Sequence, residues 1–400
     1  MSSCLCCPPC YTFWRGAFVA KSFFNKVFVQ TSTRGIRVQS ALYSKIRKGE
    51  RISREEGLFL LRNSELLDLA DLANVIRFKK NPDPRVTFVV DTNPNYTNIC
   101  NVDCIFCAFY RHPGEKGEYT YTVDEMIRNF KNAASKGVTT VLLQGGVNPA
   151  LPFDYYLEMV KRTVAEVPAI YPHFYSTSEI LGMVNVSGLS LKEVLTKLWD
   201  AGLRSIPGGG AEILSDGVKR KISSKKGTSE DWLRVMREAH ALGYKSTATM
   251  MYGHLENDED IITHLESVRK LQDEFNGFTA FVPWSFKPGN TPLEKIIPHY
   301  ATPTRYLQMI AFSRIYLDNF PHIQASWFSE GKKTGQIALH FGADDFGGTL
   351  LEENVHAAAN FVNKTNTEEC IQLIHESGFD AAQRGTLYDI KRVLPRSKAA

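Results

Sequence analysis

Residues 98–111 read Asn-Ile-Cys-Asn-Val-Asp-Cys-Ile-Phe-Cys-Ala-Phe-Tyr-Arg. Three thiols, those of Cys100, Cys104 and Cys107, therefore stand within eight residues in a C-x3-C-x2-C spacing, and the next cysteine is Cys370. Four soft ligands would complete the usual iron–sulfur cluster, so three leave one iron without a protein ligand. An open position on a metal centre is where a small molecule binds and reacts. The loop is therefore predicted to hold a reactive iron–sulfur cluster.

Two alternative roles for these thiols stay open at this point. His112 can serve as a fourth ligand in a C-x3-C-x2-C-x4-H zinc knuckle, although familiar zinc sites pair two residues with two. In the second alternative, the three cysteines are inert core residues. The loop around them carries Asn and Asp side chains, however, and core thiols have no reason to gather on a polar loop.

The bulk properties of the chain exclude several classes of protein. Of its 400 residues, 43% are apolar and 22% charged, a globular composition that fills a core and excludes disorder of the whole chain. The net charge is only +4, so nothing indicates a nucleic-acid groove or a basic membrane-binding stripe. No apolar run reaches the roughly 18 residues that a membrane helix needs. Reduced thiols in a metal-binding loop fit a cytoplasmic compartment.

The N-terminal segment is expected to lie outside the folded unit. Residues 1–38 contain four crowded cysteines, lack the pattern of a signal peptide, and are interpreted as an unstructured or erroneously assigned extension. Residues 39–85 are expected to form N-terminal helices, because apolar side chains between positions 58 and 76 recur at helical spacing. Ser53 supplies an N-cap signal for the first of them.

Residues 86–349 alternate between short β-branched or aromatic runs and amphipathic helices, a pattern typical of βα units around a parallel sheet. The predicted strands are Val86–Asp91, Thr139–Gln144, His173–Ser176, Ser205–Pro207, Ser246–Met251, Thr279–Trp284, Gln324–Trp327 and Ile337–Phe341. Helices are predicted at Val123–Lys136, Tyr155–Val167, Leu191–Ala201, Ser229–Leu242 and Asp258–Phe275. Eight strands in this span predict an α/β fold of the (β/α)8 TIM type, typically ~250 residues long. Residues 350–400 are expected to form a helical cap, with helices at Leu351–Asn360 and Thr367–Ser377.

Functional residues of such barrels gather on the loops after the carboxyl ends of the strands, which brings the unusual motifs of this chain to one mouth. The cysteine loop follows the first strand. Gly145 and Gly146 follow the second, where glycine permits close approach of the backbone. Ser176 and Glu179 follow the third, either as binding groups or as an N-cap pair for the next helix.

The fourth and fifth strands also end in candidate site residues. Gly208, Gly209 and Gly210 follow the fourth strand, and three consecutive glycines cost too much conformational entropy for a plain turn. Close packing against a ligand is the better interpretation. His254 follows the fifth strand and is a candidate for proton transfer near neutral pH.

The last three strands contribute aromatic and acidic residues. Trp284 and Trp327 suit a flat aromatic substrate, or alternatively plug the barrel. Asp344 and Asp345 stand between glycines and can bind hydroxyl groups or take up a proton; otherwise they cap the helix expected to begin near residue 349.

Taken together, residues from about 42 to 393 resemble the radical S-adenosylmethionine (SAM) superfamily, and within it the cyclic dehypoxanthinylfutalosine synthases of the futalosine route to menaquinone. Aminofutalosine synthases and deazaflavin-forming synthases share several of the motifs. The resemblance rests on the cysteine loop and on Asn95–Cys100, Pro207–Leu214, Thr247–His254, Phe281–Thr291, Gln324–Trp327 and Phe341–Val355. Pro283-Trp284 and Asp344-Asp345-Phe346 look most like the cyclising member.

The resemblance implies a reaction. A [4Fe–4S] cluster on Cys100, Cys104 and Cys107 would bind SAM at its open iron, and reductive cleavage would give a 5′-deoxyadenosyl radical. That radical would remove the hydrogen from the ribose 4′ carbon of dehypoxanthinylfutalosine, and the sugar radical would add to the benzoate ring. The electron would come from an external donor such as flavodoxin or ferredoxin.

The resemblance also implies site roles. Gly145 and Gly146 would meet the methionyl amino group of SAM, while the ribose and adenine would lie near Ser176, Glu179 and the three glycines 208–210. Trp284, Trp327, Lys287 and Arg204 are candidates for binding the substrate. His254, Asp344 and Asp345 are candidates for the final base, and the sequence does not rank them. The alternatives are a sibling reaction, or a zinc-stabilised binding protein without catalysis.

Overall fold

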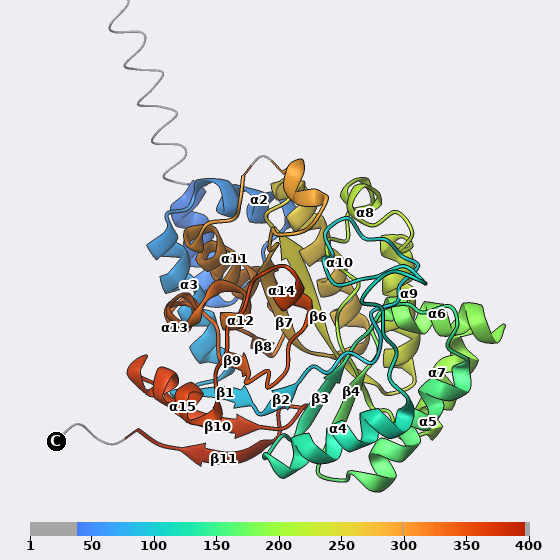
Figure 1. The fold of residues 1–400 in the computed structure, drawn as a ribbon. Coiled ribbons are helices and arrows are strands. Elements are labelled where there is room, and N and C mark those ends of the chain that lie inside the picture. Colours follow the sequence, from blue (N-terminus) through green and yellow to red (C-terminus); the bar gives the residue numbers. More distant parts are fainter. Residues whose placement is uncertain (1–37, 298, 397–400) are drawn as a thin grey trace, which may run out of the picture.

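The described part of the chain, residues 38–297 and 299–396 of the computed structural model, is built around a ring of parallel strands (Figure 1). Seven strands form one sheet in the order β2-β3-β4-β5-β6-β7-β8, and all neighbouring pairs are parallel. Strand β9 pairs with β1, and Gln324, which directly follows β8, bridges to Asp345 in β9. Because β1 leads through Val90 into β2, these contacts close the ring, and the predicted barrel-type fold is confirmed.

The first six predicted strands overlap strands of the ring. The seventh, Gln324–Trp327, does not, because the observed strand there ends at Ile323 and Trp327 already begins a helix. The observed bounds are β1 (Arg85–Val89), β2 (Asp91–Thr92), β3 (Thr140–Leu143), β4 (Tyr171–Phe174), β5 (Ser205–Ile206), β6 (Lys245–Tyr252), β7 (Phe278–Ser285), β8 (His322–Ile323) and β9 (Asp345–Gly348).

The eighth predicted strand is wrong. Residues 337–341 lie at the end of helix α13 (Lys332–Ala338) and in the turn that follows it. Ile337 is 48% exposed, so this apolar run does not enter the barrel wall. The strand at that place in the ring is β9, which begins four residues later.

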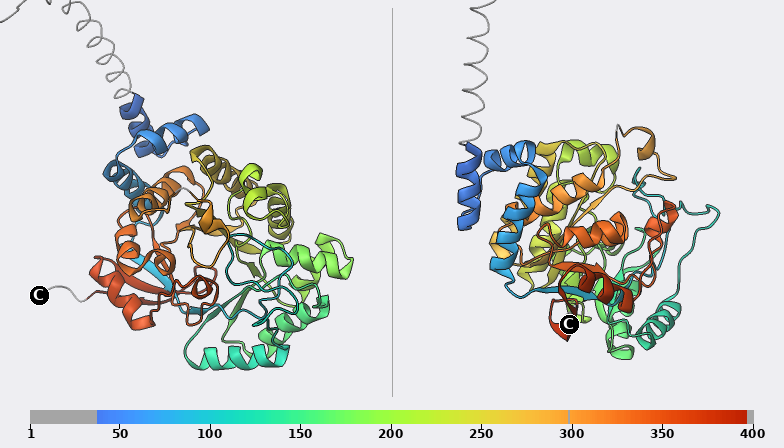
Figure 2. Two further views of the ribbon diagram at one scale, coloured as in Figure 1. Left: turned by 45° about the horizontal axis from the view of Figure 1, so that its top comes forward. Right: turned by 90° about the vertical axis from the view of Figure 1, so that its left-hand side faces the viewer.

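Helices cover the outside of the ring between successive strands (Figure 2). Their bounds are α4 (Val123–Ser135), α5 (Phe153–Glu166), α6 (Thr177–Ser187), α7 (Leu191–Asp200), α8 (Asp216–Ile222), α9 (Ser229–Ala241), α10 (Asp258–Phe275), η1 (Leu293–Lys295), α11 (Pro303–Tyr316) and α12 (Trp327–Glu330). Several begin with a side chain that accepts a backbone N–H, such as Thr122 before α4 and Asn257 before α10.

The predicted N-terminal helices are present and pack on the barrel. A helix over residues 38–48 is followed by α2 (Arg54–Asn63) and α3 (Leu66–Lys80), and these two contact α10 and α11. The predicted extension with its four early cysteines lies outside the described residues, apart from Val38, which begins the first helix. None of the helices within the described ranges is both long and apolar enough to cross a membrane.

The C-terminal region contains strands as well as helices. The short helix α14 (Val355–Ala358) and α15 (Thr367–Glu376) correspond to the two predicted helices. After them β10 (Asp380–Arg384) pairs in parallel with β1, and β11 (Ile390–Leu394) pairs antiparallel with β10. The first strand of the barrel therefore has the C-terminal segment as a neighbour, and the expectation of a purely helical cap is corrected.

Candidate active site

The cysteine loop follows β2 and is closed at its neck by backbone hydrogen bonds. Cys100 N–H donates to the Arg111 carbonyl (3.0 Å), and Arg111 N–H donates to the Asn98 carbonyl (2.8 Å). The Asn98 side chain also donates to the Gly117 carbonyl at 2.9 Å and accepts from Tyr119 N–H at 2.8 Å. A further bond from Cys107 N–H to the Cys104 carbonyl (3.0 Å) makes a tight turn between these two cysteines. The backbone thus holds all three thiols on one ordered loop.

The three thiols of this loop are the soft ligands that iron–sulfur clusters use. Within residues 38–297 and 299–396, no group of three His, Cys, Asp or Glu side chains is placed to hold a single metal ion. Burial raises the pKa of Cys104 to about 12 and also raises that of Cys107, while N–H groups of Phe109 and Tyr110 favour the Cys107 thiolate. Metal binding requires thiolates, and N–H donors at a sulfur stabilise them.

Gly145 and Gly146 pack against the segment that leads into the cysteine loop. Gly146 N–H donates to the Thr97 carbonyl at 2.9 Å, and a Cβ at Gly146 would lie 2.1 Å from the Ile99 carbonyl oxygen. A Cβ at Gly145 would lie 2.7 Å from the Tyr96 ring. The two glycines therefore allow their backbone to pack closely against the segment that precedes Cys100.

Ser176 and Glu179 form an N-cap pair, as the structural alternative for them predicts. Ser176 precedes α6, and Glu179 accepts the Ser176 N–H at 2.7 Å in a capping box. The second Glu179 oxygen accepts from the Tyr96 hydroxyl (2.7 Å) and from Gly145 N–H (3.0 Å). Burial raises the pKa of Glu179 to about 7. This pair ties α6 to the base of the cysteine loop and does not line the central cavity.

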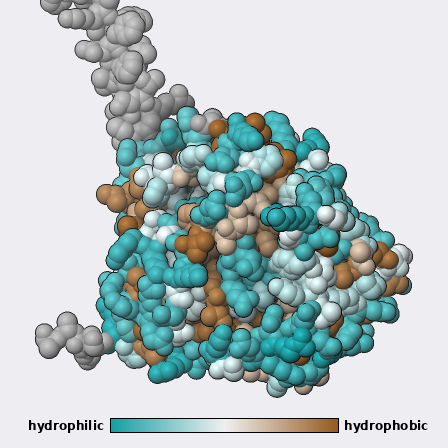
Figure 3. Space-filling model, viewed as in Figure 1, coloured by the Kyte–Doolittle hydropathy of each residue, from teal (hydrophilic) through white to brown (hydrophobic). Residues whose placement is uncertain are grey.

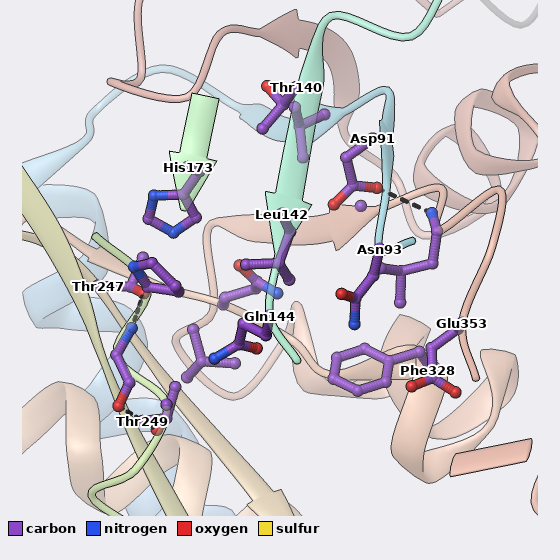
Figure 4. A pocket seen from close by; sticks show the side chains of 18 of the residues that line it. Asp91, Asn93, Thr140, Leu142, Gln144, His173, Thr247, Thr249, Phe328 and Glu353 are labelled. Atoms are coloured by element: carbon purple, nitrogen blue, oxygen red, sulfur yellow. Dashed lines mark hydrogen bonds between the residues drawn. The ribbon is translucent and has the colours of Figure 1, made fainter. Parts of the chain in front are cut away.

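A cavity of about 240 Å³ occupies the inside of the barrel (Figure 4). Alternate residues of the strands point into it, as the two-residue period of a β-strand requires. The strands and the residues directly after them contribute Val89, Asp91, Asn93, Thr140, Leu142, Gln144, His173, Thr247, Thr249, Val282 and Trp284. Later segments add Gln324, Phe328, Gly348, Leu350, Glu353, Val355, His356, Arg384, Thr386 and Tyr388. On the face of the molecule shown in Figure 3 most residues are hydrophilic, and the apolar residues form separate patches, some of them near its middle.

Three of the predicted site residues line this cavity. Gly208 N–H donates to the Thr247 hydroxyl, and the Gly208 carbonyl accepts from the Thr249 hydroxyl, both at 2.9 Å. Gly209 borders the cavity beside it, and Trp284 adds an indole ring whose centroid lies 5.6 Å from that of His356. Gly210 (φ +91°) does not line the cavity; its carbonyl accepts from Lys219 Nζ at 2.9 Å.

The three candidate bases already interact with other groups of the protein. His254 is buried, with Nδ1 accepting from Leu255 N–H at 2.7 Å and Nε2 lying 3.1 Å from the Met251 carbonyl. The carboxylate of Asp344 is paired with Arg314, and that of Asp345 with Arg384. None of the three lines the cavity.

The remaining substrate-binding candidates also lie outside the cavity. Lys287 Nζ is 2.7 Å from the Ser285 hydroxyl and 3.3 Å from Glu330. Arg204 precedes β5, at the opposite end of the barrel from the mouth, and lies over the Trp199 ring at 3.9 Å. Trp327 is fully buried, and its Nε1–H donates to the Gly348 carbonyl at 3.1 Å. Trp327 therefore packs inside the barrel wall as a structural residue, as the alternative role for it predicts.

Sequence reasoning missed several lining residues. Asp91 and Asn93 follow Val89 at two-residue spacing, so the strand period is a signal that could have identified them. His356 and Arg384 come from segments after the barrel, and no local pattern directs those segments into its lumen.

Comparisons with known proteins agree with this geometry. The radical SAM superfamily matches residues 94–268, and the CofH/MqnC C-terminal region matches residues 275–397. The cyclic dehypoxanthine futalosine synthase of Halalkalibacterium halodurans is 41% identical, with 88% of this chain and 95% of that protein covered. The aminodeoxyfutalosine synthase of Thermus thermophilus is 37% identical over 89% of this chain and 96% of its own length. The 5-amino-6-(D-ribitylamino)uracil–L-tyrosine 4-hydroxyphenyl transferase of Methanopyrus kandleri is 40% identical, covering 77% and 85%.

Among solved structures, methylornithine synthase (PylB) has a similar fold. The TM-score is 0.66 at 19% sequence identity, and the alignment covers 84% of this chain and 96% of that one. At this level of identity the likeness concerns the fold alone.

Proposed function

This chain belongs to the radical SAM superfamily, in the branch that carries the CofH/MqnC C-terminal region, and on that premise we propose that it cyclises dehypoxanthinylfutalosine in menaquinone biosynthesis. The reaction would begin with removal of the hydrogen on the ribose 4′ carbon. The relative that acts as a cyclic dehypoxanthine futalosine synthase supports this choice, since it is 41% identical along nearly its whole length. The enzyme would work in the cytoplasm with flavodoxin or ferredoxin as electron donor.

The observation that carries the proposal is the position of the cysteine loop relative to the cavity. Members of this superfamily use a [4Fe–4S] cluster and SAM, which together supply a radical that removes a hydrogen atom from the substrate. The loop follows β2, and Asp91 of this strand and Asn93 directly after it border the cavity. Glu212, which also lines the cavity, is close enough to Cys104 to raise the pKa of its thiol, so a group held by the three cysteines of the loop would adjoin the cavity. A closed barrel around the cavity would also keep water away from a reactive radical.

The wall of the cavity suits a substrate with one flat and one hydroxylated part. Trp284, Phe328 and His356 form an aromatic cluster, with the His356 ring centroid 5.3 Å from that of Phe328. Burial and the nearby Lys287 lower the pKa of His356 to about 3, so its ring is neutral and can stack on a benzoate. We do not assign the last proton to His254, Asp344 or Asp345, because their polar atoms are already engaged.

Product analysis tests the proposal directly. The anaerobically reconstituted protein would be reduced and incubated with SAM and dehypoxanthinylfutalosine, and the products identified by mass spectrometry. We expect 5′-deoxyadenosine and a cyclised product with two hydrogens fewer than the substrate, because one hydrogen atom passes to 5′-deoxyadenosine and a proton and an electron are lost when the ring becomes aromatic again. The Cys104→Ala variant should make neither, whereas Cys370→Ala, which removes a buried cysteine outside the loop, should keep both.

A sibling reaction is the second candidate function, because relatives of 37% and 40% identity carry other names. The same incubation with the substrates of an aminodeoxyfutalosine synthase, or with ribitylaminouracil and tyrosine, separates the three possibilities. Turnover of either set without cyclisation of dehypoxanthinylfutalosine would replace the proposed function by that reaction.

A further inference from the structure

Asp91 is the carboxylate that the fold holds most firmly at the wall of the cavity. Its backbone N–H donates to the Thr349 hydroxyl (3.1 Å), and its carbonyl accepts from Leu351 N–H (3.0 Å). Its Oδ1 accepts from Leu350 N–H at 2.8 Å. A Cβ at Gly348 would lie only 2.1–2.3 Å from the carboxyl atoms, so glycine at that position is what leaves room for them. The side chain is thereby fixed in one orientation towards the lumen.

The second oxygen of this carboxylate has no partner in the protein. Within residues 38–297 and 299–396, no hydrogen bond or ion pair reaches Asp91 Oδ2, although only 6% of the residue is exposed. The cation nearest to it along the cavity wall, Arg384, is paired with Asp345, and the Thr140 hydroxyl is bonded to that of Thr386 at 2.8 Å. A buried carboxylate oxygen is costly unless it accepts a hydrogen bond. Asp91 borders the cavity, so the donor to this oxygen comes from the lumen, either from water or from a bound molecule.

A hydroxyl group is the donor that fits best. An ionised carboxylate only accepts hydrogen bonds, and it would repel a carboxylate of the ligand. Burial raises the pKa of Asp91 to about 6, so the group is ionised at pH 8. Asn93, two residues further along the same wall, adds a side-chain amide that forms no hydrogen bond with the described residues and can serve a second hydroxyl.

The depth of Asp91 distinguishes two possible sources of that hydroxyl. Both SAM and the proposed substrate contain a ribose. Asp91 is level with Thr140 at the start of β3, whereas Gly145 and Gly146, which meet the cysteine loop, follow the end of that strand. The carboxylate thus lies deeper than the rim where SAM is expected.

We propose that Asp91 is a specificity-determining residue that accepts a hydrogen bond from a sugar hydroxyl of the substrate and so orients the carbon that loses its hydrogen. This inference rests on the proposed function, because it takes the ribose of dehypoxanthinylfutalosine as the hydroxylated part.

The Asp91→Asn variant tests it with little change of shape. The amide oxygen of the new side chain can still accept the hydrogen bond from Leu350 N–H. The amide NH2, a donor, then takes the place of the acceptor oxygen Oδ2. We expect kcat/KM for cyclisation to fall about 10- to 100-fold, the usual effect of losing a hydrogen bond to a charged group. Iron content and SAM cleavage without substrate should equal those of wild type. Asp200→Asn, at an exposed carboxylate on α7, is the matched control and should change neither quantity.

Analogues of the substrate identify the hydroxyl. Wild type should lose activity with the analogue that lacks the contacted 1′, 2′ or 3′ hydroxyl, and Asp91→Asn should lose nothing further with that analogue. If wild type processes all three deoxy analogues as well as the parent substrate, the proposal fails, whether or not the variant folds. An equal drop in substrate-free SAM cleavage would also overturn it, by placing the contact on SAM. Turnover of the parent substrate by wild type reports separately on the proposed function.

Discussion

Gly146 shows how much a single residue decides at this site. A Cβ there would stand 2.1 Å from the Ile99 carbonyl oxygen and 3.0 Å from the Cys100 Cβ, so Gly146→Ala must push the cysteine loop outwards. We expect the reconstituted variant to bind markedly less iron and sulfide per chain and to absorb less near ~400 nm. Gly217→Ala is the control, since no atom lies within 4 Å of a Cβ at that position in α8. Equal iron in both variants would contradict the role given to Gly146.

Asp344 is expected to act on stability, because its partners are fixed inside the protein. Burial by itself would raise its pKa, but Arg314 and His322 hold the pKa of Asp344 well below the ordinary value. Removing the charge in Asp344→Asn leaves the Arg314 guanidinium buried without its counterion, which should cost about 3–5 kcal/mol in urea unfolding at pH 7.

The pH dependence of that loss follows from the lowered pKa. A carboxylate whose folded pKa lies below its unfolded value of about 3.9 stabilises the fold above that pH, and the contribution disappears as the pH falls towards the folded pKa. The difference between wild type and Asp344→Asn should therefore be constant from pH 5 to 7 and shrink below about pH 4. Asp71→Asn, which breaks an exposed pair with Arg47, should stay within about 0.5 kcal/mol throughout.

Residue roles were predictable where spacing alone decides them. The three cysteines are close in sequence, so their spacing identifies them without a fold. Asp344 and Asp345 were interpreted together as an acidic pair. The side chains of successive residues along a strand, however, point to opposite faces of the sheet. One reaches Arg314 and the other Arg384, and these partners come from distant parts of the chain.

At the scale of elements, N-terminal caps stabilise the helices around the barrel. The Thr122 hydroxyl accepts from Glu125 N–H at 3.3 Å, and Glu125 in return accepts from Thr122 N–H at 2.7 Å. Thr122→Ala should lower the free energy of unfolding by about 1 kcal/mol, because the first turn of α4 loses a partner for its N–H groups. Thr122→Ser keeps the hydroxyl and should be nearly neutral in the same measurement. A larger loss in the serine variant than in the alanine variant would refute this account.

Helix ends were predictable for the same local reason, whereas one strand was not. The predicted bounds of α10, Asp258–Phe275, are those observed, since Asn257 caps its start and Asn276 ends it in a left-handed conformation. Strand β9 consists of Asp-Phe-Gly-Gly, a composition with poor strand propensity. Its pairing with β1 overrides that propensity, and β1 lies more than 250 residues earlier in the chain. The apolar run 337–341 was the more strand-like sequence, but it has no such partner.

At the scale of the whole molecule, the C-terminal segment completes the barrel rather than capping it. Strand β10 pairs with β1 from Arg85↔Asp380 to Phe88↔Gln383, so the first strand of the barrel meets the C-terminal segment. Arg384, at the end of β10, reaches Asp345 at the start of β9 and also borders the cavity. One ion pair therefore joins the closing strand of the ring to the segment that follows it.

This long-range link should be measurable as a coupling between Arg384 and Asp345, whose side chains are 6% and 0% exposed. Arg384→Met and Asp345→Asn each leave a buried charge alone, and each should cost about 3–5 kcal/mol in denaturant unfolding. The double variant leaves no charge behind, so its loss should be smaller than the sum of the single losses by at least about 1 kcal/mol. Lys391→Met, which breaks an exposed pair with Asp389 nearby, should change stability by less than about 0.5 kcal/mol. Strict additivity of the two buried substitutions would mean that the C-terminal strand is held by its backbone pairing with β1 alone.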